Sequence, residues 1–252
     1  MRDLVGRTAL LTGASSGLGP RIARRLHGEG LRLILTARRR AELEALAREL
    51  VGSRVLTADL SRRGEAEWLA GAAGEVDVLI ANAGVAAAGP LMTFEVDKLD
   101  QALEVNLRAP IVLSRLLLPG MLERRSGHIV LMASMAGQIP GPNSSLYSTT
   151  KFGLRGFGHS MHGELRGTGV GVSVISPSFV REAGVFAESG RRAPGLTVSP
   201  AQVAEACVRA IKHNRAEVTV APIYARIGKS FGLAAPALAT MVRSRLTDIP
   251  TD

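Results

Sequence analysis

The chain has 252 residues, of which 46% are hydrophobic and 21% are charged, a balance that fits a folded globular protein and excludes a disordered one. Its formal net charge of +9 predicts an attraction to anionic partners. Nucleic acid is not favoured, because the arginines are scattered and the aromatic residues, at 4%, are too few for a stacking surface, so a phosphorylated or carboxylated small molecule is the simpler partner.

The cysteine content and the opening of the chain bear on the compartment. Cys207 is the single cysteine, so the sequence excludes an internal disulfide and fits a reducing cytoplasm. It lies in the helical pattern AEACVRAI, where a buried small residue is expected rather than a nucleophile. The opening leads into a strand pattern without a secretory signal, and no apolar run approaches the length that spans a bilayer. We therefore expect a cytoplasmic protein.

In chain order, the first predicted unit is a short apolar strand with a glycine-rich turn at 8–20, followed by a helix over 21–30. Gly13, Gly17 and Gly19 allow a close approach of the backbone to an anion, and the helix N-terminus offers free N–H groups to it. This order of strand, turn and helix predicts a phosphate cradle, and the alternative is a plain tight turn.

Strands and helices alternate along the rest of the chain. The further strands are expected at 31–37, 53–60, 76–84, 127–134, 170–176 and 217–222. The further helices are expected at 38–51, 65–73, 97–123, 144–167 and, after an N-cap at Ser199 and a first-turn Pro200, at 201–213. Continuous apolar strands predict an α/β fold with a doubly wound, Rossmann-type parallel sheet and helices on both faces. No linker divides the chain, so residues 1–252 are predicted to form a single domain.

Four side chains on the predicted helices carry expectations of their own. Trp68 is expected to anchor the core or an interface, and Pro110 is a candidate for a kink in its helix. His159 and His162 are expected at the surface or an interface rather than as acid–base groups. No cluster in the sequence has the spacing of a metal site, so no metal is predicted.

Special residues follow several of the predicted strands. Asp59, Asn82, Ser134 and Pro177 come just after strands, as does the glycine turn. Parallel strands end at one edge of their sheet, and such folds bind ligands beyond that edge. We expect these residues to converge on one site.

Tyr147 and Lys151 stand four residues apart in a predicted helix, which places both on one face. A free tyrosine has a pKa of about 10, and a cation held beside it lowers that pKa. A tyrosine tuned in this way can exchange a proton with a substrate oxygen near neutral pH. Taken alone, the pair could equally be an ordinary amphipathic helix pair.

With these motifs in order, the sequence resembles the classical short-chain dehydrogenase/reductase family over at least residues 5–222. The resemblance rests on TGASSGLG at 12–19, Asp59, Asn82-Ala83-Gly84, Asn106, Ser134, and Tyr147 with Lys151. It implies an oxidoreductase in which a nicotinamide cofactor supplies the hydride and the protein supplies geometry and protons.

The resemblance implies four catalytic residues. Tyr147 would exchange a proton with the reacting oxygen, and Lys151 would lower the pKa of that phenol and hold the nicotinamide ribose. Ser134 would orient the substrate oxygen, and Asn106 would support a water that links Lys151 to solvent. Without the family, Ser134 could be a strand-end cap and Asn106 an ordinary polar helix residue.

The resemblance also implies the residues that bind the cofactor: Gly13, Ser15, Ser16, Gly17, Leu18, Gly19, Arg38, Asp59, Leu60, Asn82, Ala83, Gly84, Tyr147, Lys151, Pro177 and Val180. The second strand is followed by Arg38 rather than by an acidic residue, which favours NADP(H) over NAD(H) because a guanidinium matches a phosphate. Arg39 and Arg40 are interpreted as the start of a solvated helix.

One stretch departs from the family pattern. Ser178 stands where glycine is usual, and Glu182 stands where a threonine that touches the nicotinamide amide is common. The loop 179–199 is expected to cover the substrate, with mobility over 183–198. Its Val185, Phe186 and Leu196 suggest an apolar substrate body.

The predicted function is therefore NADP(H)-dependent hydride transfer between cofactor and a carbonyl/alcohol substrate, in a homodimer or homotetramer as the family implies. One alternative is a non-catalytic NADP(H)-binding regulator on the same fold. Another is a lipid ketone reductase at a membrane surface, suggested by the apolar stretch in the C-terminal segment 223–252. Packing of a C-terminal helix on the pocket or on a partner subunit is the simpler interpretation of that segment.

Overall fold

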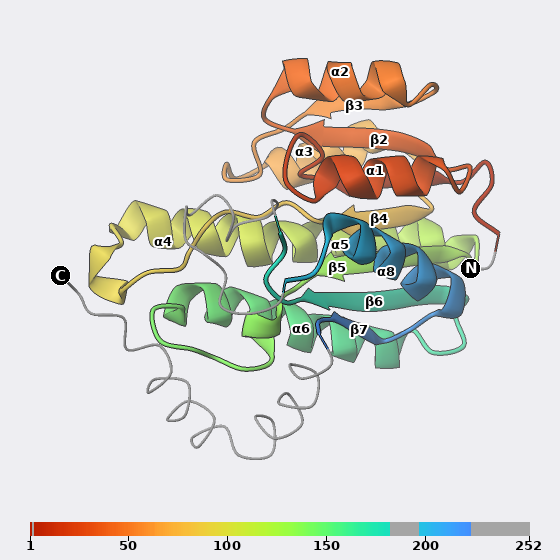
Figure 1. Cartoon of the computed structure of the whole chain (residues 1–252). Coiled ribbons are helices and arrows are strands. Elements are labelled where there is room, and N and C mark those ends of the chain that lie inside the picture. Colours follow the sequence, from red (N-terminus) through yellow and green to blue (C-terminus); the bar gives the residue numbers. More distant parts are fainter. Residues whose placement is uncertain (2, 182–196, 223–252) are drawn as a thin grey trace.

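The computed structural model describes residues 1, 3–181 and 197–222, and the architecture is a seven-stranded sheet between two layers of helices (Figure 1). The strand order is β3-β2-β1-β4-β5-β6-β7, and every neighbouring pair is parallel. The strands are β1 (Thr8–Thr12), β2 (Arg32–Ala37), β3 (Arg54–Thr57), β4 (Val78–Ala81), β5 (Gly127–Met132), β6 (Val170–Pro177) and β7 (Glu217–Val220). This order is that of a doubly wound Rossmann sheet with one further strand, so the predicted fold is confirmed.

The helices divide between the two faces of the sheet. They are α1 (Gly19–His27), α2 (Arg40–Glu49), α3 (Glu65–Ala73), α4 (Val96–Leu103), α5 (Ala109–Glu123), α6 (Ser145–Glu164) and α8 (Pro200–His213). Buried residues of α1, α2 and α8 form one core with the sheet, and those of α3, α5 and α6 form a second core on the opposite face. Both faces of the sheet are therefore dry, which explains why strands such as β5 and β6 are apolar without alternation.

The long helical stretch is continuous but not uniform. A π-helical turn, η2 (Glu104–Arg108), joins α4 to α5 directly before Pro110, which lies in the first turn of α5. Because proline has no N–H to donate, the hydrogen-bond register can change there without breaking the helix. By length and mean hydropathy, 1.2, the stretch Val96–Glu123 could cross a bilayer, contrary to our expectation that no apolar run would. Leu113, Leu117 and Met121 are nevertheless buried against the sheet, as in a core helix.

Several local predictions can be compared with the structure. Ser199 and Gln202 form a capping box at the start of α8, and Cys207 is buried, as predicted. Trp68 is 50% exposed and lies off the buried face of α3, which is formed by Ala66, Leu69, Ala70 and Ala73, so it is not a core anchor; an anchor at an interface stays a prediction. The predictions for the covering loop beyond Arg181, for Glu182 and for the C-terminal segment 223–252 lie outside the described residues.

Candidate active site

The carboxyl ends of all the strands lie at one edge of the sheet, on the side where α4 begins (Figure 1). The order of the strands reverses between β1 and β4, because β2 and β3 extend to one side of β1 and β4 to β7 to the other. In open α/β sheets this reversal leaves the crevice in which ligands bind. The glycine turn, Asp59, Asn82, Ser134 and Pro177 lie at or just after the ends of strands at this edge.

The glycine turn after β1 is shaped by close backbone contacts. Gly13 has a φ of +68°, and a Cβ there would lie 2.8 Å from the Cα of Ala83 in the turn after β4. A Cβ on Gly19, the first residue of α1, would overlap the carbonyl oxygen of Gly13. Gly17 also has a positive φ, of 60°. Only glycine fits these positions, so the turn places the N-terminus of α1 directly beside the backbone after β1.

The turn after β4 is held against the glycine turn by hydrogen bonds. The backbone N–H groups of Asn82 and Ala83 both donate to Oγ1 of Thr12, at 3.0 and 2.9 Å. The side-chain amide of Asn82 donates to the carbonyl oxygens of Thr12 and Gly13, at 3.1 and 3.2 Å. These bonds join the two strands on either side of the crevice, so this part of the site is preorganised.

The arginines after β2 do not behave as a single group. Arg38 is exposed, and its guanidinium makes no ion pair within the part of the chain that the structure describes. Arg40 pairs with Glu44 at 2.7 Å on the outer face of α2, as expected for a solvated helix. Arg39 is different: its Nη2 donates to the side-chain and backbone oxygens of Ser15, both at 3.3 Å.

Arg39 is the exposed N-cap of α2 and pairs with Glu42, so it does begin a solvated helix, and in addition it reaches the glycine turn through Ser15. The backbone of Arg39 is extended, with φ of −89° and ψ of 99°, so it and Arg38 project in different directions. The role of Arg39 could have been predicted from the sequence, because Arg38 and Arg39 are two successive basic residues directly after a strand whose end lies beside the predicted phosphate cradle. The other residues of the turn are placed as expected, with Leu18 at the N-cap of α1 and Ser16 accepting a bond from the Gly19 N–H.

Asp59 and Leu60 follow β3 at the far side of the same edge. Oδ1 of Asp59 accepts bonds from the N–H and the hydroxyl of Ser61, at 3.1 and 2.8 Å, and the Asp59 N–H donates to Glu65. Leu60 is buried. This turn is thus fixed by its own side chains before any ligand binds.

Ser134, Tyr147 and Lys151 meet at the end of β5. Ser134 caps the short helix η3 (Met135–Gly137), where its Oγ accepts a bond from the Ala136 N–H at 3.1 Å, and its side chain is close enough to Tyr147 to lower the pKa of that phenol. Lys151 lies one turn after Tyr147 on α6, with its Nζ 5.6 Å from the centre of the tyrosine ring. The predicted juxtaposition of these three side chains is therefore present in the structure.

The protonation of this group differs from the expectation. Burial raises the pKa of Tyr147, and the Ser134 side chain offsets that effect in part. Burial also lowers the pKa of Lys151 to about 8. Lys151 is not among the causes that shift the pKa of Tyr147, so the expected lowering by this cation is not seen; the Lys151 ammonium donates to the carbonyl oxygen of Met132, at 2.9 Å.

Asn106 lies in the π-helical turn η2 and is fully buried. Its Oδ1 accepts from the Val85 N–H at 2.8 Å, and its Nδ2 donates to the Val85 carbonyl at 3.1 Å. A Cβ on Gly84 would lie 3.2 Å from the same Oδ1. Asn106 thus joins the long helix to the turn after β4. The π-helical turn in which it lies is a rare helical register that is often found at functional sites.

The stretch after β6 completes the edge. Pro177 is buried at the end of β6, and Val180 is buried and pairs with Val198 as an isolated parallel bridge. The backbone N–H of Ser178 donates to Val220, but its hydroxyl is buried and has no hydrogen-bond partner in the part of the chain that the structure describes. Ser178 therefore places this hydroxyl next to the predicted cofactor position, where the glycine of the family pattern would have no side chain.

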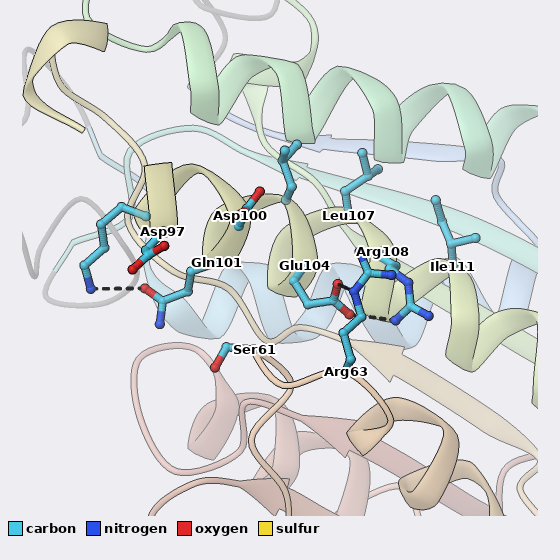
Figure 2. Close-up of a pocket in the computed structure, with 11 residues that line it drawn as sticks. Ser61, Arg63, Asp97, Asp100, Gln101, Glu104, Leu107, Arg108 and Ile111 are labelled. Atoms are coloured by element: carbon cyan, nitrogen blue, oxygen red, sulfur yellow. Dashed lines mark hydrogen bonds and ion pairs between the residues drawn. The ribbon is translucent and has the colours of Figure 1, made fainter. Parts of the chain in front are cut away.

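A hollow of the described residues lies away from the strand ends (Figure 2). It has a volume of about 770 Å³ and lies between the segment after β3 and the outer face of α4 and α5. It is lined by Ser61, Arg63, Asp97, Lys98, Asp100, Gln101, Leu103, Glu104, Leu107, Arg108 and Ile111. None of the predicted site residues lines it, and its centre is an ion-pair group in which Glu104 holds both Arg63 and Arg108. We place the site at the strand ends, because the side chains that can do chemistry meet there.

The histidines named in the sequence are not at this site. Nε2 of His159 lies 3.2 Å from Glu217, and Nδ1 of His162 lies 2.7 Å from the Val172 carbonyl oxygen. Among the residues that the structure describes, no group of three or more His, Cys, Asp or Glu side chains is arranged to hold a metal ion. The site therefore offers two hydroxyls and an ammonium at one end, and a glycine cradle at the other.

Comparisons with known proteins agree with this geometry. Residues 7–192 match the family model described as short chain dehydrogenase. The chain is 37% identical over 230 residues to the ketoacyl reductase HetN of Nostoc sp., covering 87% of this chain and 80% of that protein.

Solved structures are similar over most of the chain. A short chain dehydrogenase/reductase family protein superposes with a TM-score of 0.81 at 29% identity, covering 86% of this chain and 97% of the other. A metagenomic short-chain oxidoreductase, solved in complex with NADP, superposes with a TM-score of 0.74 at 33% identity, covering 87% of this chain and 98% of the other.

Proposed function

Since this chain belongs to the short-chain dehydrogenase/reductase family and is an oxidoreductase of that family, we propose that it transfers a hydride between NADP(H) and a carbonyl/alcohol substrate with an apolar body. The observation that carries the proposal is the meeting of Ser134, Tyr147 and Lys151 at the sheet edge that also holds the glycine turn.

The two hydroxyls would act on the substrate oxygen. Reduction of a carbonyl places negative charge on that oxygen, and hydroxyl donors fixed where the charge develops stabilise it. Ser134 would donate a hydrogen bond, and Tyr147 would donate its proton as the general acid. Reversal of the same transfer, with Tyr147 as the base, would serve alcohol oxidation.

The glycine cradle fits a dinucleotide, because side chains on Gly13 and Gly19 would collide with the backbone of the turn and displace it from the N-terminus of α1, where a pyrophosphate would bind. The nicotinamide, when bound, supplies or accepts the hydride. Lys151 would hold the ribose of that half, and bringing its ammonium toward the ribose and the phenol would require exchange of its bond to Met132. Asn106 would keep the turn after β4 beside it.

An apolar substrate body is supported by the small cluster beside Tyr147. Ala87, Ala102 and Leu146 are buried together, with Val85, Phe94, Leu99 and Tyr147 packed against them. This cluster packs against Tyr147 and is separate from the two main cores. A substrate carbonyl held by Ser134 and Tyr147 would therefore have apolar side chains beside it.

A preference for NADP(H) is supported by Arg38 and Arg39, and by the NADP bound in the metagenomic relative. Loss of one charged hydrogen bond costs about 1.5–3 kcal/mol, roughly ten- to a hundred-fold in affinity. We expect Arg38→Ala to weaken NADPH binding by that factor and to leave NADH binding nearly unchanged. Titration of both cofactors, followed by fluorescence, measures this, with Arg40→Ala as the matched control because Arg40 pairs outward with Glu44.

The same titration on Arg39→Ala tests whether Arg39, which reaches Ser15, binds the 2′-phosphate of NADPH together with Arg38. Equal or tighter binding of NADH by the unaltered protein would contradict the preference.

The function itself is tested with a panel of ketones and alcohols, using the change in NADPH absorbance as the readout. Turnover of apolar ketones supports the proposal, and absence of turnover across the panel despite tight NADPH binding contradicts it. A cytoplasmic location and a homodimer or homotetramer remain part of the proposal, and sedimentation of the purified protein would test the oligomeric state.

A further inference from the structure

Glu217 is a carboxylate in an unexpected place. It begins β7, the edge strand of the sheet, where a charged side chain would ordinarily face water. Its side chain is instead only 12% exposed. Removing a carboxylate from water is unfavourable unless charged and polar partners replace the water, so its partners show what the burial achieves.

Among the residues that the structure describes, Arg155, Gln138, Ser176 and His159 approach this carboxylate as donors. Arg155 makes two bonds, from Nε at 2.8 Å and from Nη2 at 3.0 Å. Gln138 donates from Nε2 at 2.5 Å, Ser176 donates from Oγ at 3.2 Å, and Nε2 of His159 lies at 3.2 Å. Glu217 therefore connects α6, the end of η3, and β6 at a single point.

Two of these partners lead directly to the proposed catalytic groups. Gln138 is the C-cap of η3, the short helix whose N-cap is Ser134. Arg155 lies on α6 one turn after Lys151, which is one turn after Tyr147. The carboxylate thus holds together the two elements that carry the interacting hydroxyls.

The two elements also touch through their backbones. A Cβ on Gly137 would lie 2.5 Å from the carbonyl oxygen of Lys151, so η3 rests on the backbone of α6. In contacts as close as this, a small shift of η3 changes the distance between the hydroxyls of Ser134 and Tyr147. The nearby Ser134 side chain lowers the pKa of the phenol.

We propose that Glu217 is a positioning residue: it fixes η3 against α6 and so holds the Ser134 side chain close to Tyr147. The inference rests on the proposed function for its effect on turnover, but its effect on Tyr147 can be measured without any substrate. Around Tyr147 the titratable neighbour is Lys151 on the same helix, and around Glu217 Arg155 and His159 project from α6.

The direct test is the titration of Tyr147 by tyrosinate absorbance. The chain has two tyrosines, so the difference between each protein and its Tyr147→Phe counterpart isolates the residue. In Glu217→Gln and Glu217→Ala we expect the pKa of Tyr147 to move upward from its value in the unaltered protein, because the Ser134 side chain is no longer held close to it. On a good substrate we expect kcat to fall roughly 10- to 100-fold, the scale of a small misplacement of a catalytic group, with an unchanged KM for NADPH.

Asp77→Asn is the matched control. Asp77 is also a buried carboxylate paired with an arginine, Arg7, and it accepts from the Thr8 N–H, but it lies at the opposite edge of the sheet, before β4. We expect this variant to lose stability without changing the titration of Tyr147 or kcat. An equal fall of kcat in Asp77→Asn would overturn the proposal, because loss of stability alone would then explain the effect.

Gln138→Met leaves Glu217 in place and removes the hydrogen bonds from Gln138 to Glu217 and Thr219, so it tests the link to η3 if the Glu217 variants do not fold. We expect it to move the pKa of Tyr147 in the same direction, and the double variant with Glu217→Gln to be no worse than the more severe single variant, as for residues that act through one link. Unchanged titration in folded Glu217 or Gln138 variants overturns the positioning role. Failure of the unaltered protein to reduce any ketone would contradict the proposed function but leave this titration as a valid test.

Discussion

The two halves of the sheet edge are built in different ways. Around β1 and β4, the site is made of backbone: Gly13 touches Ala83, Gly19 touches Gly13, and Thr12 receives the N–H groups of the opposite turn. Around β5, β6 and β7 it is made of side chains, with Ser134, Tyr147 and Lys151 held by partners from other elements. The first half is shaped by steric fit and the second by polar contacts.

This difference explains what each half can tolerate. A close backbone contact fails when any atom is added, whatever its chemistry, because no flexible side chain can move out of the way. A side-chain network fails when one chemical group is removed, and its effect appears at another residue. We therefore expect substitutions in the two halves to separate cofactor binding from catalysis.

The largest expected effect lies in the side-chain half, at Tyr147. Tyr147→Phe removes the hydroxyl and keeps the ring, which packs on the small apolar cluster of Ala87 and Leu146. We expect turnover to fall by at least ~10²-fold, the scale for loss of a general acid, with NADPH affinity nearly unchanged. Steady-state kinetics and a cofactor titration on the same preparation measure both.

Ser134→Ala is the companion variant, because it removes the other hydroxyl at the same point. It should also lower turnover and leave NADPH affinity intact. If Tyr147→Phe keeps most of its turnover on a good substrate, the assignment of the general acid is wrong.

Much of the fold could be predicted because its signals are local. Short patterns of a few residues predict individual elements: continuous apolar runs predict strands, glycine after β1 predicts a turn, and Ser199 with Pro200 predicts the start of α8. The relative placement of Gly13 and Asn82, or of Ser134 and Tyr147, followed from strand direction, since parallel strands end at one edge. The fold and the composition of the site were accessible for that reason.

What could not be predicted depends on contacts between residues that are distant in sequence. Glu217 holds Gln138 across 79 positions, and nothing near either residue indicates the pairing. The reach of Arg39 to Ser15 depends on the exact end of β2. The pKa of Tyr147 depends on how deeply the phenol is buried, and the Lys151 ammonium donates to Met132. Neither feature can be predicted from the four-residue spacing of Tyr147 and Lys151.

A second effect in the side-chain half concerns stability. The pKa of Lys151 is lowered to about 8 in the folded protein from 10.5, so burial of its charge disfavours folding at neutral pH. The shift corresponds to about 3 kcal/mol, and loss of the bond to Met132 offsets about 1 kcal/mol of any gain. We expect Lys151→Met to raise the free energy of unfolding by about 2 kcal/mol at neutral pH while abolishing activity.

The effect of Lys151 on the free energy of unfolding depends on pH. Between pH about 8 and 10.5 the unfolded chain binds more protons at this position than the folded protein, so the stability of the unaltered protein rises through that range. The advantage of Lys151→Met should therefore be constant below pH ~8 and shrink as the pH rises to ~10. Denaturant unfolding of both proteins at several pH values measures the difference, and an advantage that does not change with pH would mean that the charge of Lys151 is not the cause.

The smallest effect on function is expected in the backbone half, at Gly19. A Cβ there would overlap the carbonyl oxygen of Gly13 and lie 2.7 Å from the Cα of Ala14, so Gly19→Ala must displace the backbone of the turn. Overpacking of this kind costs about 1–3 kcal/mol. Because the displaced turn is also the cradle for the pyrophosphate, NADPH affinity should fall by at least ~10-fold.

The control is Gly71→Ala on α3, where a Cβ would meet nothing within 4 Å and alanine should stabilise the helix by roughly 0.5–1 kcal/mol. If Gly19→Ala binds NADPH as tightly as the unaltered protein, the backbone half does not depend on steric fit, and the contrast between the two halves fails.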